Sequence, residues 1–221
     1  MNNDYLSKPP QKGAGQAQNP NGAGIILIHE FWGVNQQIKN TADKIAGQGF
    51  AVLAVDLYKG AIAKDADEAR KMKDDVTDEH ALECVQRAII KLQEEGIAGG
   101  KIAVWGFCFG GSIAFKSAVA NLDAGAYVIY YGSMITDSET VLKKIQKPVL
   151  GIFGAEDKSI PSTKVETMKN VLTGLGKPNE IYIYAGAGHA FANEECENYN
   201  AEAARDAWEK TMAFLKKYLL T

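Results

Sequence analysis

A tight glycine-rich turn between a buried strand and a helix constrains this chain more than any other feature. Residues 102–105 form a short apolar run typical of a strand buried on both faces, and the small apolar residues of 112–120 predict a helix. The turn between them, residues 106–110, reads Gly-Phe-Cys-Phe-Gly. Its terminal glycines let the backbone fold back sharply, so Cys108 is expected to project from the tip. The pattern is that of a nucleophile elbow with cysteine in place of serine.

Two interpretations of Cys108 follow from the turn alone. A sulfur at a helix N-terminus is favoured as a thiolate, because free N–H groups and the helix dipole stabilise negative charge there. A free cysteine is also commonly just a small core residue. The other two cysteines, Cys84 and Cys196, add neither metal-ligand spacing nor a disulfide framework, so we expect no metal, and we expect Cys84 to pack in a helix.

Strands and helices alternate along the whole chain. Further buried strands are expected at 25–28, 50–55, 127–131, 149–153 and 181–184, and helices at 35–48, 64–95, 139–146, 163–175 and 201–220. In the last helix, we expect Ala204, Trp208, Met212 and Leu215 to form the inner face. This alternation predicts an α/β fold with a mostly parallel sheet covered by helices on both faces. Without a repeat or interior linker, we expect one domain over 1–221, in which 1–23 supply an extended piece near Tyr5 and a flexible loop.

Composition excludes several classes of function. The chain has 221 residues, of which 46% are hydrophobic and 23% charged, which is ordinary for a globular protein. Its net charge of −3 gives no basic surface for nucleic acid, and no apolar run approaches the roughly 20 residues of a membrane span. The N-terminus lacks the order of a secretory signal, so we expect a cytoplasmic protein. Whether it is a monomer or a homodimer stays open.

A cysteine nucleophile needs a base within hydrogen-bond reach and a third group that orients the base. Where an elbow carries the nucleophile, the acid and then the histidine follow it along the chain, and this order selects His189. The acid should follow a strand, which leaves Glu156 and Asp157 after the strand at 149–153. An oxyanion hole would take the backbone N–H of Phe109 and one from the loop after an early strand, at Phe31.

Six short motifs in this order resemble the dienelactone hydrolase (carboxymethylenebutenolidase) family, from Tyr5 onward. They are His-Glu-Phe-Trp-Gly at 29–33, Asp-Leu-Tyr at 56–58, the elbow with the following glycine, Tyr-Tyr-Gly at 130–132, Gly-Ala-Glu-Asp at 154–157 and Gly-His-Ala-Phe at 188–191. The resemblance implies an α/β-hydrolase fold, ester or enol-lactone hydrolysis and no cofactor. It favours Asp157 over Glu156 as the acid. It also implies that Glu30 is a buried glutamate that holds the resting thiol of the nucleophile.

Two departures from the family concern the substrate. Members that cleave dienelactone clamp its carboxylate with arginines and with a serine directly after the catalytic histidine, whereas this chain has Ala190 and Asn193 at the positions after His189. Arg70 is the one candidate for an upstream clamp, and we expect four aromatic residues to line an apolar pocket: Trp32, Tyr58, Tyr131 and Phe191. The substrate would be a small ester or lactone. The alternatives are a catalytically silent ligand-binding or redox-sensing protein, a thioesterase or a peptidase.

Overall fold

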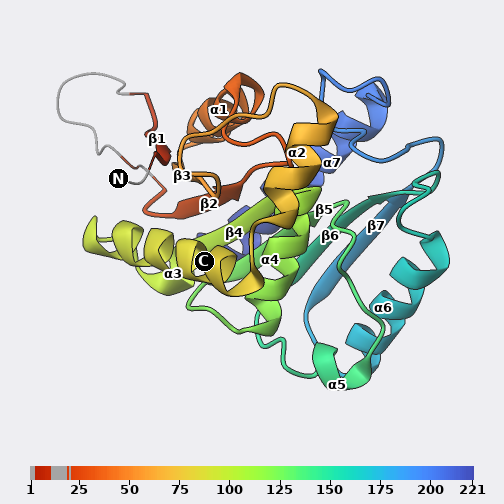
Figure 1. The fold of residues 1–221 in the computed structure, drawn as a ribbon. Helices are drawn as coiled ribbons and strands as arrows, with labels where there is room; N and C mark the ends of the chain where they lie inside the picture. The colour runs from red at the N-terminus through yellow and green to blue at the C-terminus, as the bar shows by residue number, and fades with distance from the viewer. Residues whose placement is uncertain (1–2, 11–18, 20) are drawn as a thin grey trace.

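The protein is built around a seven-stranded sheet (Figure 1). The computed structural model describes residues 3–10, 19 and 21–221. The strand order is β1-β3-β2-β4-β5-β6-β7, in which only β1 (Tyr5–Ser7) runs antiparallel to its neighbour. The expected extended piece near Tyr5 is therefore an edge strand paired with β3, while the loop predicted after it falls mostly on residues 11–18 and 20, outside the described residues.

The central strands form because each is a continuous apolar run. Five of them are buried along their whole length: β2 (Gly24–Ile28), β3 (Ala51–Val55), β4 (Ile102–Phe107), β5 (Ala126–Tyr130) and β6 (Val149–Gly154). A strand that is covered by helices on both faces has its apolar side chains removed from water on both faces. Full burial of one large aliphatic side chain stabilises the fold by about 1.5–3 kcal/mol. The outermost parallel strand, β7 (Asn179–Tyr184), is only partly buried.

Helices cover both faces of the sheet, as predicted (Figure 1). On one face, α1 (Gln36–Ala46) packs on β3, and α7 (Ala201–Leu219) packs across β4, β5 and β6. On the other face, α3 (Asp78–Glu94) and α4 (Phe109–Val119) pack on the central strands. The remaining helices of the described residues are α2 (Ala66–Asp74), α5 (Glu139–Leu142) and α6 (Ser162–Gly174), and a 3₁₀ turn lies at Gly99–Lys101.

Two helix boundaries differ from the sequence prediction. The helical region expected over 64–95 is two helices, because Thr77 adopts an extended conformation and its hydroxyl accepts the N–H of His80, which caps a new helix. The helix expected over 139–146 ends at Leu142. Glutamate and lysine are good helix formers, so propensity alone did not reveal the interruption at Thr77.

The inner face of α7 is also rotated from the predicted one. Met212 and Leu215 are buried as expected, but the rest of the buried stripe runs through Ala203, Ala207 and Thr211, while Trp208 is only half-buried. Thr211 is the physical reason, since its hydroxyl hydrogen-bonds the fully buried hydroxyl of Tyr130 on β5 at 2.8 Å. A buried polar pair selected this face, and hydrophobic pattern alone does not reveal such a pair.

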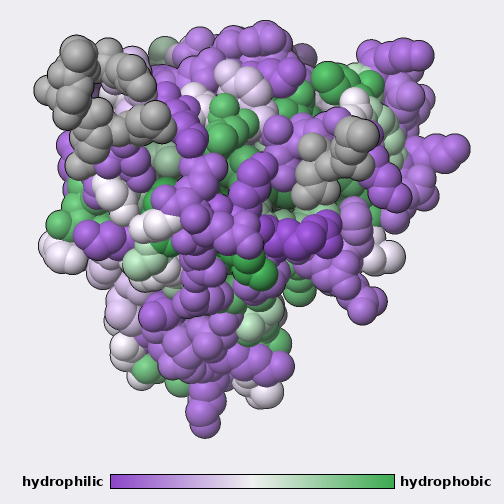
Figure 2. Space-filling view, turned by 90° about the vertical axis from the view of Figure 1, so that its left-hand side faces the viewer, coloured by the Kyte–Doolittle hydropathy of each residue, from purple (hydrophilic) through white to green (hydrophobic). Residues whose placement is uncertain are grey.

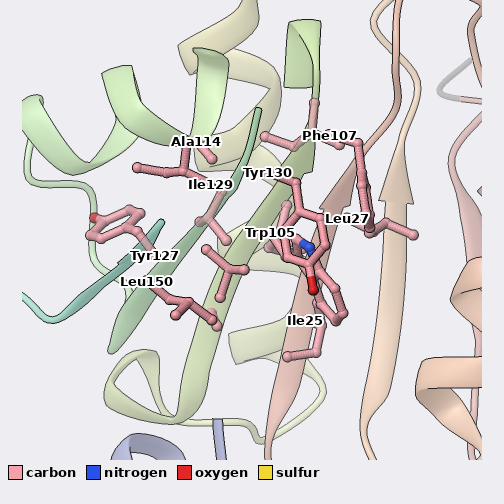
Figure 3. Packing of buried hydrophobic residues seen from close by; sticks show 14 of the residues in the cluster. Ile25, Leu27, Trp105, Phe107, Ala114, Tyr127, Ile129, Tyr130 and Leu150 are labelled. Atoms are coloured by element: carbon pink, nitrogen blue, oxygen red, sulfur yellow. The ribbon is translucent and has the colours of Figure 1, made fainter. Parts of the chain in front are cut away.

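The core lies between the sheet and its helices, where side chains of β2, β4, β5 and β6 interdigitate (Figure 3). Trp105 is fully buried, and its ring centroid lies 5.4 Å from that of Tyr130. The face shown in Figure 2 is mainly hydrophilic, with small separate hydrophobic patches. In the part of the chain that the structure describes, no helix combines the length and the apolar character that a bilayer span requires.

Candidate active site

The turn after β4 has the sharp geometry that the sequence predicted. Cys108 sits between β4 and α4 with φ 52° and ψ −110°, a conformation that L-residues rarely adopt. A Cβ on Gly106 would lie 1.9 Å from the carbonyl oxygen of Gly110, and a Cβ on Gly110 would lie 2.3 Å from that of Ile28. Only glycine fits at either position, so the backbone strain is concentrated at the cysteine that the turn presents.

Three loops at the carboxyl edge of the sheet bring a cysteine, a histidine and an aspartate together. Nε2 of His189 lies 3.0 Å from Sγ of Cys108, and Nδ1 of His189 lies 2.6 Å from Oδ2 of Asp157. Asp157 follows β6 and is buried, and its other carboxylate oxygen accepts the N–H of Ser159. His189 follows β7 and stays partly exposed. This is the arrangement of nucleophile, base and orienting acid.

The charge of His189 is set by its two partners. Burial alone would lower the pKa of its imidazole, but hydrogen bonds to Asp157 and Cys108 outweigh burial and raise that pKa to about 10. The ring is therefore an imidazolium at neutral pH, with Nδ1–H donating to the carboxylate and Nε2–H donating to the sulfur.

Phe31 and Phe109, the residues expected to supply the oxyanion hole, line the same cavity. Phe109 is the first residue of α4, where a helix leaves its N–H groups without intrahelical acceptors. Phe31 lies in the loop after β2, and both residues line the cavity that contains Cys108. This loop is held against the elbow by Gly110, whose N–H donates to the carbonyl of His29 at 3.1 Å, and by Tyr58, whose hydroxyl donates to the carbonyl of Phe31.

Glu30, which the family resemblance assigned to the resting thiol, hydrogen-bonds Asn193 in the structure. It is only 6% exposed, and its Oε2 accepts a hydrogen bond of 2.7 Å from Nδ2 of Asn193. Burial raises the pKa of the Glu30 carboxyl, and the Asn193 hydrogen bond and the charge of His189 partly oppose that rise. Among the described residues, no hydrogen bond joins Glu30 to Cys108, whose sulfur pairs with His189 instead.

The cavity at Cys108 has a volume of about 500 Å³. Cys108 and His189 lie in it, and its apolar wall comes from Val76, Phe109, Ile113 and Met134. Its cations come from α2 and α4 and are each paired with a carboxylate: Arg70 with Asp67 at 2.6 Å, Lys73 with Asp74 at 3.1 Å, and Lys116 with Asp78 at 2.5 Å.

Of the five pocket residues expected from the sequence, only Arg70 lines this cavity. Tyr58, Tyr131 and Phe191 are buried, and the ring of Trp32 packs against that of Phe31 in a tilted arrangement with centroids 4.5 Å apart. Aromatic residues at strand ends pack in the core as readily as they line pockets, and here packing prevailed.

Other residues of the cavity wall were not expected from the sequence, among them Lys73, Lys116 and Met134. Lys73 follows Arg70 at helical spacing and was the only one with a readable signal. In the described ranges, no group of three or more histidine, cysteine, aspartate or glutamate side chains is placed to hold a metal ion.

A second cavity, of about 320 Å³, lies between α1 and α7 and includes Trp105, Phe107 and Trp208. It contains no member of the cysteine–histidine–aspartate arrangement. The cavity at the elbow is therefore the candidate active site, because it holds Cys108 together with His189, whose imidazole pKa is strongly raised.

Comparisons with known proteins agree with this geometry. Residues 13–219 match the model of the dienelactone hydrolase family. A protein of Yersinia pestis that is provisionally named carboxymethylenebutenolidase is 30% identical over 88% of this chain and 78% of its own length. A similarly named protein of Saccharolobus solfataricus is 28% identical over 90% of this chain and 91% of its own.

Solved structures show the same architecture. A protein of Klebsiella pneumoniae, provisionally described as a dienelactone hydrolase, superposes with a TM-score of 0.83 at 26% identity, covering 97% of this chain and 99% of its own. A dienelactone-hydrolase-like promiscuous phosphotriesterase from metagenomic libraries superposes with a TM-score of 0.79 at 21% identity over 97% and 98% of the two chains, a likeness of fold. The fold is that of the α/β-hydrolases, and by its family match and its curated relatives this chain belongs to the dienelactone hydrolase family.

Proposed function

We propose that this protein hydrolyses small esters or lactones through an acyl-cysteine intermediate on Cys108. The family is one of ester and lactone hydrolases. The observation that carries the cysteine mechanism is the continuous hydrogen-bonded series from Sγ of Cys108 through His189 to Asp157. A sulfur at the tip of the elbow, paired with a charged imidazole, is a nucleophile that needs no further activation.

The first half-reaction forms the acyl-enzyme. The Cys108 thiolate attacks the carbonyl carbon, a C–S bond forms, and the carbonyl oxygen becomes an oxyanion. The N–H groups of Phe31 and Phe109 are the candidates for stabilising this charge, because fixed backbone donors need no reorganisation as charge develops. The C–O bond to the alcohol then breaks, and the leaving oxygen takes the proton of the His189 imidazolium.

The second half-reaction restores the enzyme. His189, now neutral, removes a proton from a water molecule that attacks the thioester carbonyl, and the C–S bond breaks as the acid product forms. The product acid then leaves the cavity, while Cys108 returns as a thiolate beside the re-protonated ring. Asp157 keeps Nδ1 of His189 as a donor throughout, so Nε2 faces the reacting atoms in both half-reactions.

The cavity favours an uncharged substrate. Its apolar wall suits an alkyl or aryl acyl group, whereas Arg70, Lys73 and Lys116 are each paired with a carboxylate. A carboxylated lactone would have to compete with these aspartates for a cation or lose its hydration without compensation. We therefore expect small neutral esters to have a higher kcat/KM than lactones that carry a carboxylate.

The test is hydrolysis of p-nitrophenyl acetate, with intact-mass detection of an acetylated enzyme after rapid acid quench. The proposal expects turnover in the wild type, an acetyl adduct on the peptide containing Cys108, and neither in Cys108→Ala. Turnover that persists in Cys108→Ala would refute the cysteine mechanism. A folded wild type that fails on esters, lactones, thioesters and peptides would instead favour the silent or redox-sensing alternative.

A further inference from the structure

The loop that follows His189 turns one polar side chain into the core. Asn193 is 7% exposed, and its carboxamide is held at both ends: Nδ2 donates to Oε2 of Glu30 at 2.7 Å, and Oδ1 accepts the N–H of Glu195 at 2.9 Å. Its own N–H donates to the carbonyl of Ala190. Hydrogen bonds within its own loop thus orient the amide independently of Glu30. A residue that positions another group must itself be held in this way.

Glu30 has one further polar neighbour, the hydroxyl of Tyr131. Oε1 of Glu30 and this hydroxyl are both buried without a well-formed hydrogen bond among the described residues, but the Tyr131 side chain is close enough to help lower the pKa of the Glu30 carboxyl. Tyr131 is near both acidic groups, because Glu30 and Cys108 each contribute to the rise of its phenol pKa. A buried carboxyl group with an open acceptor would readily accept a hydrogen bond from a thiol that came within reach.

We propose that Asn193 is a positioning residue that holds Glu30 away from Cys108, so that the Cys108–His189 pair is assembled before any substrate binds. The inference rests on the proposed function and on three distances: 2.7 Å from Asn193 to Glu30, 3.0 Å from His189 to Cys108, and 2.6 Å from His189 to Asp157. Because the carboxamide of Asn193 is neutral, it hydrogen-bonds the Glu30 carboxyl group without placing a second cation beside the sulfur.

The arrangement predicts a free enzyme whose thiolate is reactive without a substrate trigger. The groups facing Cys108 are His189, which stabilises the thiolate, and the phenols of Tyr58 and Tyr131, whose raised pKa values keep them neutral. Among the described residues, Glu30 is a buried carboxyl group that could hold the sulfur as a neutral thiol, and its hydrogen bond to Asn193 fixes the carboxyl group in another direction.

The test is the rate of iodoacetamide alkylation of Cys108 in the full chain from pH 5 to pH 10, with Cys84→Ser and Cys196→Ser in every variant. Asn193→Leu keeps the side-chain size and removes the donor. We expect the midpoint of its alkylation profile to move up by about one pH unit, which makes alkylation below the midpoint about tenfold slower. An unchanged profile in folded Asn193→Leu would overturn the proposal.

Glu30→Gln provides a second test that does not depend on the folding of Asn193→Leu. If Asn193 already keeps Glu30 from the thiol, Glu30→Gln should alkylate within about twofold of the wild type, and Asn193→Leu should have no further effect in that background. Much faster alkylation in Glu30→Gln would show that Glu30 restrains the thiol despite Asn193. Both alkylation experiments measure the thiol in the absence of substrate. Their outcome is therefore independent of the proposed ester hydrolysis, which the Cys108→Ala variant tests.

Discussion

Two histidines at the same edge of the sheet have imidazole pKa values that are shifted in opposite directions. His29 follows β2 and is completely buried, and burial lowers the pKa of its imidazole to about 4. His189 follows β7, remains partly exposed, and has its pKa raised to about 10 by Asp157 and Cys108. One residue type, in loops of similar origin, gives a neutral ring in one place and an imidazolium in the other.

The partners explain the difference. His29 donates from Nδ1 to the carbonyl of Glu30, and its Nε2 accepts the N–H of Leu57, so an added proton at Nε2 would face a donor. His189 instead faces the carboxylate of Asp157 at Nδ1 and the sulfur of Cys108 at Nε2. A buried neutral histidine acts as a structural connector between two loops, whereas a histidine between a carboxylate and a sulfur can carry a proton and transfer it.

The largest effect should come from breaking the His189 arrangement. Cys108→Ala and His189→Ala should each lower kcat/KM for p-nitrophenyl acetate by roughly 10⁴- to 10⁶-fold, and the double variant should cost little more, because triad members act as a unit. Cys196→Ala is the matched control and should keep normal turnover. Fully additive losses in the double variant would show that the two side chains act independently.

The next largest effect should come from Asp157→Asn, which keeps shape but removes the anion at Nδ1 of His189. We expect kcat to fall by about 10³- to 10⁴-fold. Since the aspartate helps to raise the pKa of His189 to about 10, the alkaline limb of the pH–rate profile should move to lower pH. Rates measured from pH 6 to pH 11 check this. If the alkaline limb of Asp157→Asn has the same midpoint pH as that of the wild type, Asp157 does not set the charge of the His189 ring.

His29 should instead control stability at acid pH. Its folded pKa of about 4 is below the unfolded value of 6.5, so the unfolded chain binds more protons between these values, and stability is lost as pH falls through them. The loss is about 3 kcal/mol at most. His29→Asn should flatten this window relative to the wild type, measured by urea unfolding at pH 7.5 and pH 4.5. Equal pH dependence of the two proteins would contradict a neutral buried ring.

The smallest effect concerns Tyr58, which contacts both His29 and the loop that contains Phe31. Its ring contacts that of His29 at 4.7 Å, and its hydroxyl donates to the carbonyl of Phe31 in the oxyanion loop. Tyr58→Phe should lower kcat by about two- to fivefold, in line with about 0.5–1 kcal/mol for one hydrogen bond, with KM little changed. Tyr127→Phe loses a similar bond to the carbonyl of Leu122 far from the site and should leave kcat unaltered.

The strands and the elbow could be predicted from sequence because their causes are local. Continuous apolar runs specify buried parallel strands wherever they occur, and glycines at 106 and 110 leave the cysteine between them at the tip of the turn. His189 was selected by the order of nucleophile, acid and histidine that follows an elbow, and Asp157 was preferred to Glu156 by the family resemblance. Cys108, Asp157 and His189 each follow a parallel strand, and the carboxyl ends of parallel strands share one edge of the sheet. Their loops therefore had to converge, whatever the details of packing.

The features decided only in three dimensions depend on contacts between distant segments. The buried face of α7 is set by the hydrogen bond between Thr211 and Tyr130, and the cations of the cavity come from α2 and α4 as already paired groups. The partner of Glu30 is the clearest case, since Asn193 lies 163 positions away along the chain. Sequence determined which chemical groups reach the carboxyl edge of the sheet, whereas tertiary structure decided which of them pair. A buried acceptor without a donor costs free energy, so the pairs that form are those whose donor and acceptor meet in the folded chain.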